Sequence, residues 1–375
     1  MRRILPALLL LGLLCGCSAM LERSYLVVTP HPEHPATADD SDVLQVSTYQ
    51  DLVNGILYFV NQGAASGVIR LTDYTRDVEA DLNSACLEVA RDAPIGAYAV
   101  DFIKYDYTRV VKYYEASITI SYRRTLEQIQ SVQNVTGSTA IRAELREALL
   151  DFASESVLHI AYFNEDEEYI ESLIQQAYYD APAAAFGMPQ YTVSLYPETG
   201  SERIVEILLT YPDDPDVLRR RSAQLQQQAA QLTESLQGQS SRRAAQSLFD
   251  LLRTRVEVAA AVEDGSRSTA YAALMENRAD SQGIALAFQL LCQELELEST
   301  VVQGTLDGQV HFWNVYTLED GVYRHIDASR EAGLLLTDDE LSSLGYQWNR
   351  EETPACGSSA VPPSPGLSPS PSPGA

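Results

Sequence analysis

Three side chains in the last third of the chain could together carry out nucleophilic acyl chemistry: Ser281, His311 and Asp327. In such a set, the imidazole takes the proton of the attacking group, and the carboxylate holds the imidazole in the correct tautomer. A helix that begins at the nucleophile adds the positive end of its dipole, which favours an anion there. These residue types indicate a nucleophile–base–orienter site, provided that the chain brings them together.

The apolar pattern predicts the elements that must position these three residues. Four apolar residues follow Ser281 at helical spacing, so we expect a helix that starts at Ser281 and has this residue on its buried side. They are Ala285, Phe288, Cys292 and Leu295. Three strands are then expected, over 299–305, 310–318 and 322–327, with a turn at 319–321. His311, Trp313 and Val315 share one face of the middle strand, and Asp327 ends the third.

The same part of the chain resembles the transglutaminase-like superfamily. Four segments carry the resemblance, in the order and spacing of the family: residues 269–274, 279–288, 311–314 and 323–327. The resemblance covers roughly residues 242–348 and implies a papain-like core with a Cys–His–Asp triad. His311 falls on the triad histidine and Asp327 on the triad acid, whereas Ser281 stands where the catalytic cysteine is expected. We expect four further residues to flank the cleft: Tyr271, Gln282, Trp313 and Asn314.

The residues around the three triad positions also have structural interpretations. We expect Trp313 to pack beside the cleft and not to stack on a ligand, and Asn314 to hydrogen-bond to nearby backbone. Tyr271 either flanks the cleft or fills the core. His325 is expected to be a satisfied strand residue, with a second cleft histidine as the alternative.

A serine at position 281 changes the chemistry that the resemblance implies. A cysteine thiol beside a helix N-terminus and a histidine ionises readily because its pKa falls to about 3.5–7.5. A serine hydroxyl must instead lose its proton during the attack. We therefore expect an inactive or impaired domain that retains a cleft for peptide or cell-wall stem peptide. Because His311 and Asp327 are retained, an active Ser–His–Asp hydrolase or acyltransferase for amides or esters is the alternative, and a structural or assembly protein is a third.

Cysteine and histidine usage favours neither a metal site nor a disulfide framework. The chain has five cysteines and five histidines without a CxxC pair, so no metal or other cofactor is expected. Cys292 lies about 16 Å along the helix axis from Ser281 at 1.5 Å per residue, so we expect it in the core and not as a substitute nucleophile. Cys356 is predicted to lie in a flexible tail.

Residues 1–17 have the pattern of an export signal. Two arginines precede an apolar stretch over 4–14 that is too short to span a bilayer comfortably, and no later stretch is long and apolar enough. The stretch ends in Leu14-Cys15-Gly16-Cys17, which resembles a bacterial lipobox. The resemblance implies a lipidated Cys17 that anchors the protein to the bacterial cell membrane, facing the extracellular or periplasmic side. The net charge of −26 argues against nucleic acid and anionic lipid as partners.

The pattern before the last domain predicts an α+β protein with two repeated modules. The modules cover 46–123 and 141–212, after a linker over 18–45, and each combines helices with short strands. The first module is expected to have a strand near 98–104, after the triplet Asp92-Ala93-Pro94. The same triplet recurs at 180–182.

A helical connector over 213–240 links the modules to the transglutaminase-like domain at 241–350. Leu218, Leu225 and Leu232 recur every seven residues in this connector. Since the repeat spans only a few turns, we expect it to pack within the monomer and not to form a coiled-coil dimer. Residues 351–375 are rich in proline and serine and are expected to be disordered.

Overall fold

The chain is an α+β protein. The structure, a computed structural model, describes residues 43–357, and the chain divides into two compact units between Ser131 and Val132. The predicted export signal, Cys17, most of the predicted linker and residues 358–375 lie outside the described residues. Within the described range, no helix is both long and apolar enough to cross a membrane.

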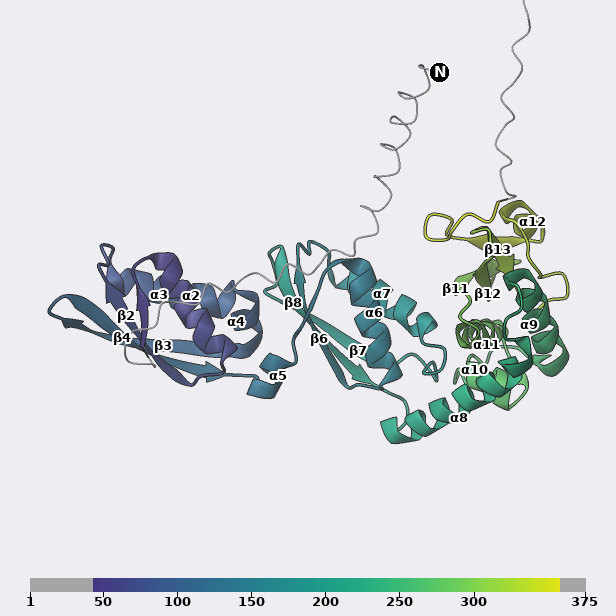
Figure 1. The fold of residues 1–375 in the computed structure, drawn as a ribbon, viewed down its shortest axis with the longest axis horizontal. Helices are drawn as coiled ribbons and strands as arrows, with labels where there is room; N and C mark the ends of the chain where they lie inside the picture. Colours follow the sequence, from purple (N-terminus) through teal and green to yellow (C-terminus); the bar gives the residue numbers. More distant parts are fainter. Residues whose placement is uncertain (1–42, 358–375) are drawn as a thin grey trace, which may run out of the picture. The chain divides into compact units, whose positions relative to one another are not determined.

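A four-stranded sheet with two long helices on one face forms the first unit (Figure 1). Its strands are β1 (Val43–Val46), β2 (Ser66–Thr72), β3 (Val100–Val110) and β4 (Tyr113–Tyr122), in the order β1-β2-β4-β3. The first pair is parallel and the others are antiparallel. Helices α2 (Tyr49–Asn61) and α3 (Val78–Arg91) begin at side-chain caps from Thr48 and Asp77. Buried and exposed residues alternate in β4, as expected for a sheet covered on one face.

The start of β3 differs from the strand predicted near 98–104. Pro94–Ala99 form the short helix α4, and β3 begins only at Val100. Proline suits the first turn of a helix, because its φ is already helical and its missing N–H would have no partner there. The triplet at 92–94 therefore starts a helix. The short helix α5 (Leu126–Gln130) ends the unit.

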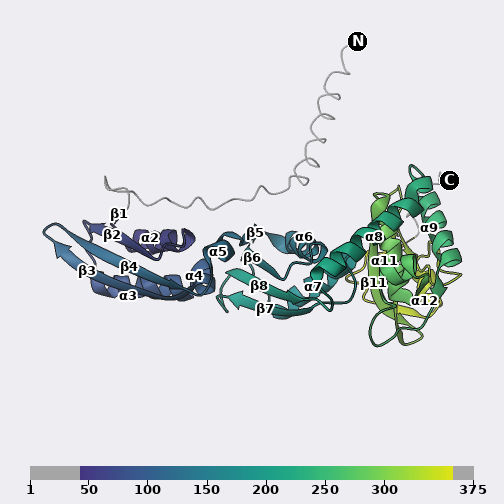
Figure 2. The same ribbon diagram turned by 90° about the horizontal axis from the view of Figure 1, so that it is seen from below.

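The second unit begins with a sheet of the same topology (Figure 2). Its strands are β5 (Gln133–Val135), β6 (Glu155–Ala161), β7 (Gln190–Tyr196) and β8 (Glu202–Thr210), in the order β5-β6-β8-β7. Again the first pair is parallel and the others are antiparallel. Helices α6 (Gly137–Leu150) and α7 (Glu167–Asp180) occupy the same places in the chain order as α2 and α3. The two sheets thus share strand order, strand pairing and helix placement.

The connector forms helix α8 (Pro215–Thr233) and a short 3-10 turn, η2 (Glu234–Leu236). Asp214 caps α8 by accepting the backbone N–H groups of Asp216 and Val217. Leu218 and Leu225 are 1% and 0% exposed and belong to a core that includes residues of helices α10 (Ala270–Met275) and α11 (Ser281–Glu294). The leucine repeat therefore packs within the chain, as predicted.

Leu225→Ala is expected to lower the free energy of unfolding by about 2–5 kcal/mol, because it removes a buried side chain and leaves a cavity. Gln226→Ala, on the exposed side of the same helix, is the control and should change it by less than about 0.5 kcal/mol. Urea unfolding followed by circular dichroism measures both. Unchanged stability of Leu225→Ala together with dissociation of an oligomer would instead support a coiled-coil role for this helix.

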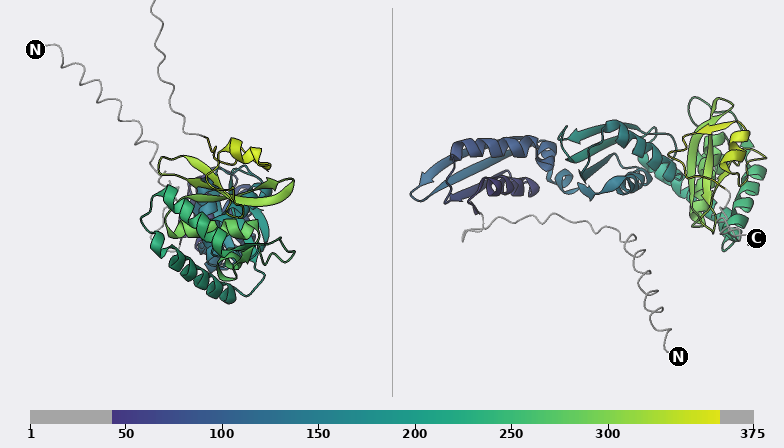
Figure 3. Two further views of the ribbon diagram at one scale, coloured as in Figure 1. Left: turned by 90° about the vertical axis from the view of Figure 1, so that its right-hand side faces the viewer. Right: turned by 90° about the horizontal axis from the view of Figure 1, so that it is seen from above.

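The C-terminal part places an antiparallel sheet between helices (Figure 3). Its helices are α9 (Ser241–Arg255), α10 (Ala270–Met275), α11 (Ser281–Glu294) and α12 (Asp338–Ser343). The sheet has the order β13-β12-β11-β14 and consists of β11 (Ser299–Leu306), β12 (Gln309–Thr317), β13 (Tyr323–Ile326) and β14 (Tyr346–Trp348). A short parallel pair, β9 (Glu257–Val258) and β10 (Arg278–Ala279), precedes α11.

The two faces of this sheet belong to different hydrophobic clusters. Phe312 and Tyr316 of β12 pack into the core with α11. Trp313 and Val315 face the other way and pack with Leu341 of α12. This alternation confirms the predicted shared face of Trp313 and Val315, because successive strand residues point to opposite sides.

Cys356 does not lie in a flexible tail, which corrects the prediction. Its side chain is 0% exposed and packs in the cluster of Trp313 and Leu341. Its backbone N–H donates to the Asp338 carboxylate at 3.1 Å, and its carbonyl accepts from the Asp338 N–H at 2.8 Å. Residues up to 357 thus complete the sheet's outer cluster, and burial raises the pKa of the Cys356 thiol to about 12.

Candidate functional site

Ser281 is the first residue of α11, as predicted. Asp280 caps the helix by accepting the Gly283 N–H at 3.0 Å, and its second carboxylate oxygen accepts the hydroxyl of Ser268. A β-carbon at position 283 would lie 2.5 Å from the carbonyl oxygen of Arg267, so only glycine allows the first turn to approach this loop. These contacts fix the N-terminus of α11, and with it Ser281.

The hydroxyl oxygen of Ser281 accepts the backbone N–H of Phe312 at 3.3 Å. Strand β13 ends opposite Asn314, where Ile326 is paired. Among residues 43–357, the edge of β12 before that point has no strand partner, and the Phe312 N–H bonds to Ser281 instead. Ser281 thus lies directly beside the residue that follows His311.

His311 and Asp327 form a buried pair. The imidazole Nε2 lies 2.6 Å from Asp327 Oδ2, and the two side chains are 14% and 1% exposed. The same Oδ2 accepts the hydroxyl of Tyr346 at 2.6 Å, and Oδ1 accepts both the backbone N–H and the hydroxyl of Ser329. Burial acts to raise the pKa of Asp327, but the hydrogen bonds and charge of His311, with Ser329 and Tyr346, outweigh it and lower the pKa.

This pairing determines the tautomer of His311. An ionised carboxylate only accepts hydrogen bonds, so Nε2 carries the proton and Nδ1 keeps a lone pair in the neutral ring. The imidazole can therefore act as a base through Nδ1. Within residues 43–357, no hydrogen bond joins Ser281 to His311. The structure thus contains an oriented base and a nearby hydroxyl that is held by backbone.

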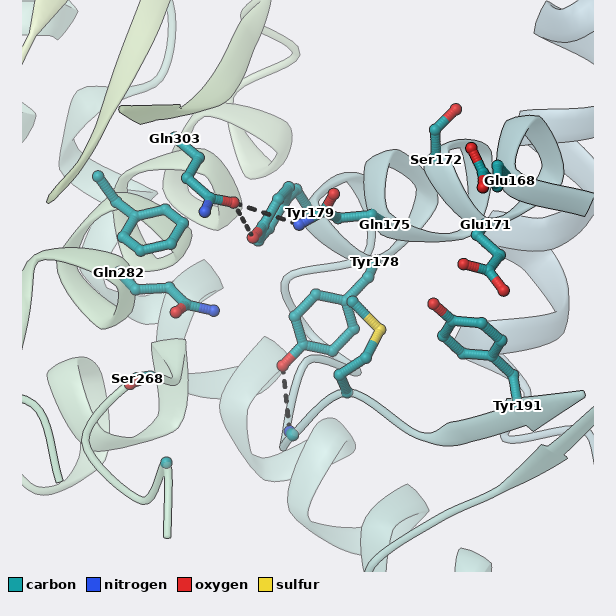
Figure 4. A pocket seen from close by; sticks show the side chains of 14 residues that line it. Glu168, Glu171, Ser172, Gln175, Tyr178, Tyr179, Tyr191, Ser268, Gln282 and Gln303 are labelled. Carbon is teal, nitrogen blue, oxygen red and sulfur yellow. Dashed lines mark hydrogen bonds between the residues drawn. The ribbon is translucent and has the colours of Figure 1, made fainter. Parts of the chain in front are cut away.

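A cavity of 660 Å³ is lined by residues of α7 and of the C-terminal part, but not by Ser281 or His311 themselves. Gln282, which follows Ser281, and Phe312, which follows His311, contribute to its lining. The opposite wall includes Glu168 and Glu171 of α7 (Figure 4). Sequence reasoning assigned no role in the site to α7.

Comparison with known families now identifies the C-terminal part. Residues 226–328 match the model of the transglutaminase-like superfamily. This region is a transglutaminase-like domain. The match begins inside α8, before the predicted domain start at 241, and the burial of Leu225 and Ala229 in the domain core gives the physical reason. Helix α8 packs as part of the domain and not only as a connector.

Three solved structures are similar to parts of the chain. A TGase is 14% identical, with 61% of this chain and 65% of that chain covered and a TM-score of 0.28. A candidate cysteine protease from Cytophaga hutchinsonii is 14% identical, with 42% and 70% covered and a TM-score of 0.26. A candidate protease from Parabacteroides distasonis is 9% identical, with 69% and 39% covered and a TM-score of 0.24. The chain thus spans somewhat less than two thirds of the TGase. No curated protein matches the chain.

The residues expected to flank the cleft have different positions in the transglutaminase-like domain. Gln282 lines the cavity. Trp313 and Asn314 are only 1% exposed, so they do not line an open cleft. Asn314 donates to the carbonyl of Ala285 at 3.1 Å, which ties β12 to α11. Tyr271 packs against the ring of Phe186, with ring centroids 5.8 Å apart, so it joins the domain to the preceding module.

Two partners of Asp327 were missed by sequence reasoning. Ser329 follows Asp327 by two residues, a spacing typical of an Asx turn, so its role has a local signal. Tyr346 lies on β14, which pairs with β11 at the edge of the sheet. Nothing local links Tyr346 to Asp327, because their contact depends on the strand order.

His325 is a satisfied strand residue, as expected. Its Nδ1 accepts the indole N–H of Trp313 at 3.0 Å, and its Nε2 lies 2.9 Å from Asp338 Oδ1. Ligand atoms of His325, Asp338 and Cys356 lie within 4.8 Å of one another, as in a metal site. However, the Trp313 bond leaves the ring proton on Nε2, and the raised pKa of Cys356 disfavours the thiolate that a metal needs. The cluster is a closed hydrogen-bond network.

Stability is expected to fall as the pH drops below about 6.5, because His325 is buried as the neutral ring. Burial lowers its pKa from 6.5 and outweighs the opposing effect of Asp338. The unfolded chain therefore binds a proton at a higher pH than the folded chain does. The stability that neutral His325 contributes is fully present at a pH above its pKa in the unfolded chain. It is lost as the pH falls through the lower pKa of His325 in the folded chain. Urea midpoints between about pH 5 and 7.5 should show a shallower slope in His325→Gln; an unchanged slope would contradict this assignment.

Proposed function

We propose that this protein is a bacterial surface lipoprotein whose transglutaminase-like domain binds peptide, such as a cell-wall stem peptide, without turning it over. One observation carries the proposal: a serine occupies the nucleophile position, and its oxygen accepts the Phe312 N–H. That bond occupies a lone pair of the hydroxyl oxygen, and among residues 43–357 the hydroxyl makes no hydrogen bond to the His311 base. A hydroxyl must be deprotonated during attack, so a nucleophile that does not bond to its base is a poor one.

The His311–Asp327 pair favours the alternative, an active Ser–His–Asp hydrolase or acyltransferase for amides or esters. Its 2.6 Å contact provides an oriented base. In addition, catalytic hydrogen bonds in a free enzyme often shorten only when substrate binds. The two functions differ in whether Ser281 forms a covalent acyl or phosphonyl adduct.

A fluorophosphonate probe tests this difference directly. We expect the full chain, purified in detergent, to show no more labelling than its Ser281→Ala variant. A folded control enzyme with a Ser–His–Asp triad should be labelled under the same conditions. Labelling of the wild type that disappears in Ser281→Ala would overturn the inactive assignment and support the hydrolase.

A purely structural or assembly role has less support. It rests on the two repeated modules and on the leucine repeat in α8, but Leu218 and Leu225 are buried within the chain and are not available to a partner helix. Light scattering should therefore show a monomer. A stable oligomer would restore this role.

Lipid anchoring at Cys17 forms the other part of the proposal. It is supported by the signal-like pattern of residues 1–17. Labelled fatty acid should be incorporated into the wild type in a bacterial host, and the label should be lost in Cys17→Ser. Retention of the label in that variant would contradict the anchoring site.

A further inference from the structure

We propose that the cavity between α7 and the transglutaminase-like domain seats a cationic side chain of the bound peptide. This inference rests on the proposed peptide-binding function and adds the class of ligand. It gives the preceding α+β module a part in recognition, because α7 belongs to that module.

The cavity has the size of a ligand site and two different walls. Its volume of 660 Å³ lies within the range of about 300–1,000 Å³ that is typical of small-ligand pockets. Gln282 and Phe312 belong to the transglutaminase-like wall and stand next to Ser281 and His311 in the chain. His311 lies on the opposite face of β12 from Phe312, so the cavity borders the site on the side of Ser281, whose Oγ accepts the Phe312 N–H at 3.3 Å. A peptide bound at Ser281 could extend a further side chain into it.

All the charged side chains that line the cavity are acidic. Glu168 and Glu171 line the cavity, and its lining contains no lysine, arginine or histidine. Within residues 43–357, neither carboxylate has an ion-pair partner within 4.0 Å, and both side chains are exposed. Figure 4 shows both on the side of the cavity opposite Gln282. A cationic group that enters would meet two carboxylates that have no protein cation to neutralise them.

Aromatic rings supply the apolar surface that a long basic side chain needs. The half-buried rings of Tyr179 and Tyr191 line the cavity together with the two carboxylates, and the buried rings of Tyr178 and Phe312 lie behind them with little exposed surface. Burial raises the pKa of Tyr178, and burial with the charge of Glu171 raises that of Tyr191, so both phenols stay neutral. The methylene stem of a lysine packs well on such rings, and its ammonium gains from a ring face nearby.

The acidic wall is attached to the transglutaminase-like domain. Gln303 of β11 accepts hydrogen bonds from the amide of Gln175 and the hydroxyl of Tyr179, both at 3.2 Å. Tyr179 also packs edge-on against Phe312, with ring centroids 6.0 Å apart. At the end of α7, Gln293 donates to the carbonyl of Asp180 at 2.9 Å. These contacts hold α7, and with it the two carboxylates, at the cavity. Less conformational entropy of the protein is then lost when a ligand binds.

Calorimetric titration of the full chain in detergent tests the proposal with two capped pentapeptides. One is acetyl-Ala-Ala-Lys-Ala-Ala-amide, and the other has norleucine in place of lysine. We expect the wild type to bind the lysine peptide about fivefold to tenfold more tightly, the ratio that two partly exposed ion pairs provide. The preference should shrink between about 0.05 M and 0.5 M salt because exposed charges are screened.

Two matched double variants distinguish binding to these two carboxylates from a general attraction of cations to the acidic chain. Glu168→Gln/Glu171→Gln should abolish the preference. Glu165→Gln/Glu167→Gln changes the net charge equally, at exposed positions outside the cavity lining, and should retain it. Equal binding of both peptides, or loss of the preference in both double variants, would overturn the cationic site and leave peptide binding intact. Binding of neither peptide at millimolar concentration would overturn both this inference and the proposed function.

Discussion

Asp327→Ala is expected to lower the free energy of unfolding of the transglutaminase-like domain by about 3–5 kcal/mol, the usual result of removing one partner from a buried charged pair. The carboxylate is 1% exposed and accepts four hydrogen bonds. Its removal leaves donors of His311, Ser329 and Tyr346 buried without an acceptor, and each such group costs about 1–3 kcal/mol. Urea unfolding monitored by near-ultraviolet circular dichroism measures the loss.

Two variants separate the hydrogen bonds from other effects. Asp327→Asn keeps the shape of the side chain and one acceptor oxygen, but its NH₂ group replaces the second oxygen and faces donors. We therefore expect a smaller loss of unfolding free energy, about 1–3 kcal/mol. Asp339→Ala removes an exposed carboxylate from the same part of the chain and should change the stability by no more than about 1 kcal/mol. If Asp327→Ala were no worse than Asp339→Ala, the network would have no structural role.

The difference between wild type and Asp327→Ala should narrow in acid. Because the folded pKa of Asp327 is lowered, its carboxylate contributes fully above the unfolded value of about 3.9. That contribution is lost as the pH falls through the folded pKa, where the wild type also loses its charge. A difference that stays constant down to about pH 2 would show that the lost stability comes from packing and not from the charge.

Ser281→Cys is expected to create a thiol that reacts with iodoacetamide about tenfold to thirtyfold faster at pH 7 than an ordinary cysteine. The position combines a helix N-terminus, the Phe312 N–H and the nearby His311 base, which together favour a thiolate. An ordinary thiol with a pKa of about 8.5 is only a few per cent ionised at this pH, so a lowered pKa has a large effect. Mass spectrometry of the alkylated peptides gives the rate at this position.

The chain offers a close control for this experiment. Gln282→Cys places a thiol one residue further along, at the cavity and without the Phe312 bond, and should react at an ordinary rate. The described native thiols provide little background, since burial raises the pKa of Cys86 and Cys356 to about 12 and also raises that of Cys292. Adding His311→Gln to Ser281→Cys should slow the reaction. Equal rates for the two introduced thiols would mean that position 281 is not built for a thiolate.

The local part of the site could be predicted from the sequence. Asp280 caps a helix with apolar residues at helical spacing, so the start at Ser281 depends only on neighbouring residues. The alternation along β12 likewise separated Trp313 and Val315 from Phe312. Motif spacing was enough to identify the transglutaminase-like domain, which the family match confirms.

Two local predictions needed correction because a second local preference opposed the one on which they relied. The strand predicted near 98–104 is present but begins two residues later, at Val100, because Pro94 stabilises the first turn of a short helix that extends to Ala99. Composition placed Cys356 in a flexible tail, although the chain up to residue 357 still has apolar surface to cover. A composition argument does not detect one buried cysteine next to a proline-rich segment.

Residue types, local spacing and the helix start determined which side chains could act as nucleophile, base and acid, and that serine replaces the expected thiol. The tertiary structure decided what surrounds them. Tyr346 reaches Asp327 because β14 pairs with β11, and Glu168 and Glu171 reach the cavity because α7 docks on Gln303. These contacts join residues far apart in the chain, and their free energy depends on strand order and helix docking, which no local pattern specifies.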